Sequence, residues 1–168
     1  MTQTRKVSAL TEPIENPSPD DIAVWNRTFA PRAFNRTWEL LDLEELTRQE
    51  EEDMLAAALA QRYHWYEVGT QRNRSIADWQ VSRVAAVLGY ADLARRFGER
   101  SLEIVVEHDL DPFVRGFAHE AIARAAASVD DVETFIEHLE LAKAALAEIE
   151  DEEDRDVLAA DLAEMSEE

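Results

Sequence analysis

Residues 132–149 read VETFIEHLELAKAALAEI and carry the clearest helical pattern in the chain. Apolar side chains recur every three or four residues, at Val132, Phe135, Ile136, Leu139, Ala142, Leu146 and Ile149. Glutamates take up the other face, at Glu133, Glu137, Glu140 and Glu148. Such a stripe is typical of an amphipathic helix that packs one side against a core.

The rest of the chain continues in the same way, and no stretch alternates apolar and polar residues as a half-buried strand does. Ser18-Pro19 and Asp111-Pro112 are typical helix starts, and Gly69 and Gly89 are typical helix ends. Pro31 is expected to interrupt the first segment and to leave a second short helix ending at Leu41. The longer predicted helices cover residues 47–68, 75–88, 91–108, 112–128, 130–149 and 152–165.

Short connections between such helices favour antiparallel pairs. Residues 84–102 also align with residues 123–141, since both have small residues, a short turn and then a larger apolar stripe. The sequence therefore predicts an all-α fold of stacked antiparallel helical hairpins, a tetratricopeptide-like superhelix of about seven or eight helices. We expect a flexible N-terminal arm over residues 1–17 and a single domain over residues 18–168 that ends in an acidic helix.

The formal net charge is −20, and the chain has no cysteine. This charge argues against nucleic acid and anionic membranes as partners, because both require clusters of Lys and Arg. The absence of cysteine excludes disulfides and thiolate chemistry. No signal peptide and no apolar run of about 20 residues is present, so a cytoplasmic location is expected.

Several segments resemble an uncharacterised bacterial family with a tetratricopeptide-like fold, over roughly residues 34–165. The similar segments include Gln61-Arg62-Tyr63-His64-Trp65, Trp79-Gln80, Ser82-Arg83-Val84 and residues 117–125. The resemblance implies a helical-hairpin fold and brings no established activity or catalytic residue. The Trp-Leu-Gly-Tyr signature of regular tetratricopeptide units is missing, so the number and regularity of the repeats are not implied.

Candidate site residues gather between Arg62 and Arg83. Gln80 and Arg83 fall on the otherwise apolar face of the 75–88 helix, and Arg83 follows Trp79 by one helical turn. One hypothesis is a polar pocket in which two arginines bind a carboxylate or phosphate between tryptophans. The candidate residues are Arg62, His64, Trp65, Trp79, Gln80, Arg83 and Glu120. The alternative is an internal packing network in which Arg62 or Arg83 pairs with Glu120.

These features favour a non-catalytic protein-interaction module, a helical-repeat adaptor whose partner is a protein or a peptide, possibly one with a carboxylate. A small-molecule binder or minor enzyme, with His64 or Glu120 handling a proton, is the alternative. A third reading is a homodimer. No cofactor or metal is expected, because the four histidines lack metal-ligand spacing. The aromatic residues near the N-terminus are expected either to cap the stack or to form a dimer contact, at Trp25, Phe29, Phe34 and Trp38.

Overall fold

A computed structural model describes residues 16–167, so most of the predicted arm and Glu168 lie outside the described residues. The described part contains seven α-helices and no strand. None of these helices is both long enough and apolar enough to cross a membrane. The helices are α1 (Pro19–Leu41), α2 (Arg48–Val68), α3 (Gln71–Val87), α4 (Ala91–His108), α5 (Pro112–Ala127), α6 (Val132–Leu146) and α7 (Glu152–Glu167).

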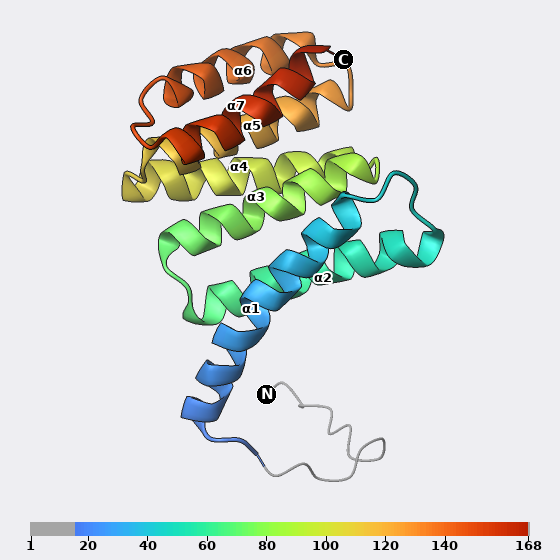
Figure 1. Ribbon diagram of the computed structural model, residues 1–168, viewed down its shortest axis with the longest axis vertical. Coiled ribbons are helices and arrows are strands. Elements are labelled where there is room, and N and C mark those ends of the chain that lie inside the picture. The colour runs from blue at the N-terminus through green and yellow to red at the C-terminus, as the bar shows by residue number, and fades with distance from the viewer. Residues whose placement is uncertain (1–15, 168) are drawn as a thin grey trace, which may run out of the picture.

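Helices that follow one another in the sequence pack together (Figure 1). α1 pairs with α2, α3 with α4, and α5 with α6, while α7 lies against α5 and α6. Contacts between α2 and α3, and between α4 and α5, join the pairs into a stack. The prediction of an all-α stack of helical hairpins with about seven or eight helices is confirmed, and the described residues form seven.

Most helix starts follow from capping residues in the sequence. The Ser18, Thr47 and Thr70 side chains each accept a hydrogen bond from the third backbone N–H of the helix that follows. The cap at Thr70 starts α3 at Gln71, four residues before the predicted position. Gly89 ends the hairpin helix α3 with a φ of 74°, a left-handed conformation that glycine adopts at little cost.

The expected break at Pro31 is wrong, because α1 runs without interruption through this proline. Proline removes one backbone hydrogen bond from a helix interior. Here the ring lies on the exposed side of α1, while Ala30 and Leu40 are buried on the side that packs against the stack. Packing on both sides of Pro31 therefore holds a single long helix together despite the missing bond.

Aromatic rings run through the core from α1 across α3 to α5. The Trp38 and Trp79 ring centroids lie 5.8 Å apart, and those of Trp79 and Phe117 lie 4.8 Å apart in an edge-to-face arrangement. Phe34 and Phe113 pack against the same cluster. Of the four N-terminal aromatic residues, Phe34 and Trp38 thus belong to the core, whereas Trp25 and Phe29 are about half exposed.

The acidic C-terminal helix is packed on the stack through its apolar side. Leu158 is fully buried, and Leu162 and Met165 are almost as inaccessible. At Gly116 on α5 an added Cβ would lie 2.3 Å from the Leu158 Cδ2 atom, so only a glycine lets α7 approach this closely. Asp161 and Glu164 of this helix lie near an arginine described below.

The apolar stripe of α6 is only partly covered. Leu139 and Ala142 are buried as expected, but Val132 and Ile136 are 63% and 54% exposed. α6 contacts α5 and α7 on one side, and no other described helix packs extensively against it. The end of the stack therefore leaves apolar side chains in contact with solvent.

Candidate functional site

The first polar cluster surrounds Asp78 of α3, a fully buried carboxylate. Arg62 of α2 forms an ion pair with Asp78, and the Tyr66 hydroxyl donates a hydrogen bond to it. Arg100 of α4 lies 3.6 Å from the same carboxylate. These four residues, the Asp78 cluster, join three helices, and pairing with two arginines compensates for the burial of the charge.

Arginines also surround the Tyr66 ring. The Arg62 guanidinium lies 4.0 Å from the ring centroid, and the Arg74 Nη2 donates a 2.8 Å hydrogen bond to the Tyr66 carbonyl. Burial, together with the bond to the Asp78 carboxylate, raises the pKa of the Tyr66 phenol above 10.0. Tyr66 is therefore a neutral donor that orients Asp78.

The second polar cluster surrounds Glu120 of α5, which is also fully buried. The Trp79 Nε1 donates a 2.7 Å hydrogen bond to one carboxylate oxygen, and the Arg124 Nε donates a 2.6 Å bond to the other. The Arg83 Nη1 lies 3.9 Å from Glu120. We call Trp79, Arg83, Glu120 and Arg124 the Glu120 cluster.

Two acids of α7 also lie near Arg83 of this cluster. Asp161 lies 2.9 Å from the Arg83 Nη1, and Glu164 lies 3.7 Å from its Nη2. The Arg83 guanidinium also lies 5.2 Å from the Trp38 ring, and its side chain is only 12% exposed. Carboxylates of this chain and aromatic rings therefore already surround Arg83.

The structure separates Arg62 and Arg83, which the sequence hypothesis placed in one pocket. Arg62 belongs to the Asp78 cluster and Arg83 to the Glu120 cluster, each with carboxylate partners from this chain. The predicted alternative, an internal pair between Arg83 and Glu120, agrees with the observed geometry. That these residues also contact a partner stays a prediction.

The other candidate residues also make internal contacts. The His64 Nδ1 lies 2.7 Å from the Asn26 Oδ1 of α1, and the Gln80 Nε2 donates a 3.2 Å bond to the Phe34 carbonyl. Trp65 is half-buried at the end of α2. Glu120 accepts hydrogen bonds at both oxygens from Trp79 and Arg124 of this chain.

Two histidines that the sequence analysis did not pair lie together between α5 and α6. The Nδ1 atoms of His119 and His138 are 3.1 Å apart. Burial lowers the pKa of His119 to about 4, and the nearby His138 and Arg115 contribute to the same shift. Burial also lowers the pKa of His138. Both rings are therefore neutral at pH 7, which allows one to donate a hydrogen bond to the other.

An open groove with a volume of about 780 Å³ lies between α4 and α6, with α5 as its floor. Its apolar lining includes Leu102, Val106, Ile122 and Val129, of which Val106 is 74% exposed and Val129 is 56% exposed. Five acids and one arginine line it as well, at Asp92, Arg95, Glu99, Glu103, Glu107 and Asp131. We call this feature the acidic groove.

A second groove, of about 750 Å³, lies at the end of the stack between the C-terminal end of α3 and the helices α5, α6 and α7. Val87, Val132 and Phe135 give it an apolar wall, while its charges are mixed, with Arg124 and Lys143 beside Asp130 and Asp131. None of the seven candidate residues named from the sequence lines either groove. The sequence signal for the acidic groove is the set of acids at helical spacing along residues 91–108, at Asp92, Glu99, Glu103 and Glu107.

Within the described residues, no group of three or more His, Asp or Glu side chains is arranged to hold a metal ion. No family model matches the chain, and no curated protein or solved structure matches it either. The family resemblance inferred from the sequence therefore stays a prediction, and the geometry alone carries the functional argument.

Proposed function

We propose that this protein is a non-catalytic interaction module that binds a helical segment of a partner protein in the acidic groove. The observation that carries the proposal is the combination of exposed apolar side chains with acids along one open face. Val106 and Val129 remain in contact with solvent there, although the transfer of apolar groups out of water lowers the free energy. Burial of these two side chains by a partner therefore favours binding.

The shape of the acidic groove suits a helix. α4 forms one wall over its whole length of 18 residues, about 27 Å at the usual helical rise. An amphipathic helix of a few turns lies in such a groove with its apolar side on the floor. The partner segment would then contact α4 on one side and Thr134 and His138 of α6 on the other.

The charge of the groove defines the chemistry of the partner. Arg95 is already paired with Glu99 at 2.8 Å, and Asp131 caps α6 by accepting a hydrogen bond from the Thr134 N–H. Asp92, Glu103 and Glu107 line the groove beside them. A segment with lysines or arginines on both sides of its apolar stripe complements these acids and is steered toward them. The arginines of the two buried clusters already pair with carboxylates of this chain. They are therefore less suited than the acidic groove to bind a partner.

The test uses a synthetic peptide of about 18 residues, roughly 27 Å long as a helix, with leucines on one face and lysines on both flanks. A fluorescent label on the peptide reports binding by anisotropy. The wild-type chain should bind it with an affinity that falls as salt is added, since exposed charges are screened. The double variant Glu103→Lys/Glu107→Lys should weaken binding by roughly tenfold or more.

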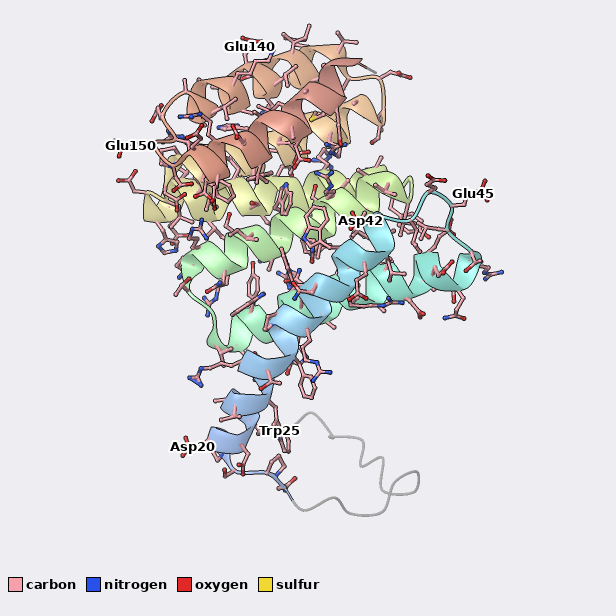
Figure 2. All side chains as sticks on the ribbon, viewed as in Figure 1. Asp20, Trp25, Asp42, Glu45, Glu140 and Glu150 are labelled. Carbon is pink, nitrogen blue, oxygen red and sulfur yellow. The ribbon has the colours of Figure 1, made fainter. Side chains whose placement is uncertain are left out.

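A matched control is Glu44→Lys/Glu45→Lys, which changes the net charge by the same amount in the exposed loop between α1 and α2. Glu45 lies at the outer edge of the molecule in Figure 2, and neither Glu44 nor Glu45 lines the acidic groove. This control should bind almost as the wild type does. Equal weakening by both double variants would mean that net charge alone attracts the peptide. That result would contradict the acidic groove as the binding site. A peptide with glutamate in place of lysine should not bind.

A further inference from the structure

An exposed apolar stripe lies at the opposite end of the stack from α6 and α7, on α1. Ile22, Trp25 and Phe29 follow one another at helical spacing and are 43%, 49% and 48% exposed. The first turns of α1 project beyond the other helices (Figure 1), and Trp25 lies on this projecting part (Figure 2). Between Pro19 and Ala30, only Asn26 and Ala30 are buried.

The charges of the helix that carries this stripe balance, unlike those of the chain as a whole. α1 carries three arginines against three acids, whereas α7 carries one arginine against seven acids. In a chain with a net charge of −20, two copies repel each other over most of their surfaces. Contact through α1 brings together two helices whose own charges balance, which keeps this repulsion small.

The charges that flank the stripe on one copy are complementary to those on a second copy. Asp21 and Arg32 are eleven residues apart, about three helical turns, so both lie on the same side of α1, one before and one after the stripe. Arg32 forms no ion pair within the described part of the chain. In an antiparallel pairing of two α1 helices about a twofold axis, Arg32 of each copy lies beside Asp21 of the other.

We propose that a second copy of this chain covers the stripe, and that the protein is a homodimer built on antiparallel α1 helices. Trp25 of the two copies meets near the axis, and Ile22 of each copy packs against Phe29 of the other. Aromatic residues at the centre and charged pairs at the rim are typical of such interfaces. The acidic grooves lie on other helices and stay open in this arrangement.

Light scattering after gel filtration, over a range of loading concentrations, measures the mass in solution. The wild type should approach twice the chain mass of 19.1 kDa and dissociate on dilution. The variant Trp25→Ser/Phe29→Ser should stay at the mass of one chain with unchanged helicity by circular dichroism, because both side chains are about half exposed in the single chain. A wild type that is monomeric at every concentration overturns the proposal, as does a dimer that survives this double replacement.

A charge exchange tests the antiparallel pairing itself. Arg32→Asp should weaken the dimer by placing acids of both copies together, and Asp21→Arg should weaken it by placing bases together. Asp21→Arg/Arg32→Asp should dimerise more tightly than either single variant, because the two partners are exchanged. About 16 Å of helix separates residues 21 and 32 in one chain, so such a rescue arises only between copies. A double variant no tighter than the singles contradicts the pairing.

Discussion

The indole Nε1 of Trp79 on α3 donates a 2.7 Å hydrogen bond to the fully buried carboxylate of Glu120 on α5. Trp79 therefore belongs both to the aromatic core and to the Glu120 cluster. Trp79 packs against Trp38 and Phe117, while Glu120 holds Arg124 and lies near Arg83. The middle of the stack therefore depends on polar and apolar contacts together.

The variant Glu120→Ala should lower the free energy of unfolding by about 3–5 kcal/mol, because it leaves two partly buried arginines without this partner. Urea denaturation followed by circular dichroism measures the loss. The matched control is Glu140→Ala, which removes an exposed pair with Lys143 and should cost about 0–1 kcal/mol. Similar losses for both variants would show that the buried cluster contributes no more than a surface pair.

The variant Gly116→Ala should loosen α7 from the stack. The added methyl would lie 2.3 Å from the Leu158 Cδ2, and Leu158 has no room to move because it is fully buried. Overpacking of this kind costs roughly 1–3 kcal/mol. Hydrogen exchange should become faster in α7 first, while α1 and α2 keep their protection. Uniform faster exchange along the chain would mean that α7 is not a separate unit.

Stability should fall as the pH is lowered from about 6.5 toward 4. The folded protein holds the pKa of His119 at about 4, whereas an unfolded histidine titrates near 6.5. Between these values the unfolded chain binds more protons, so acid favours unfolding. Urea denaturation at pH 7, 6 and 5 measures this slope.

The variant His119→Gln should make the slope between pH 6.5 and 5 shallower, because it removes the group with the most depressed pKa. The remaining slope reports His138, whose pKa is also lowered. An unchanged slope in the variant would assign the pH dependence to other groups and contradict the role given to the histidine pair.

Capping residues and apolar spacing predicted most of the helices and their order. Ser18 and Asp111 start helices through local hydrogen bonds that the sequence pattern predicts. Pro31 was mispredicted because tertiary packing, which no local pattern encodes, holds α1 together on both sides of it.

The polar clusters were harder to predict than the helices. Asp78 lies sixteen residues after Arg62, and an acid at that position is indistinguishable from a surface residue until α2, α3 and α4 are placed together. Similarly, the pairing of Arg83 with Asp161 requires α7 to fold back onto α3. The acidic groove arises from the gap between α4 and α6, which spacing along one helix does not reveal.

Hydrogen exchange with and without the lysine–leucine peptide reports where on the protein the peptide binds. Binding in the acidic groove should slow exchange in α4 around residues 102–107 and in α5 around residues 122–126, with α1 and α2 unchanged. Protection confined to α1 and α2, or none at peptide concentrations that saturate the anisotropy signal, would contradict the acidic groove as the binding site.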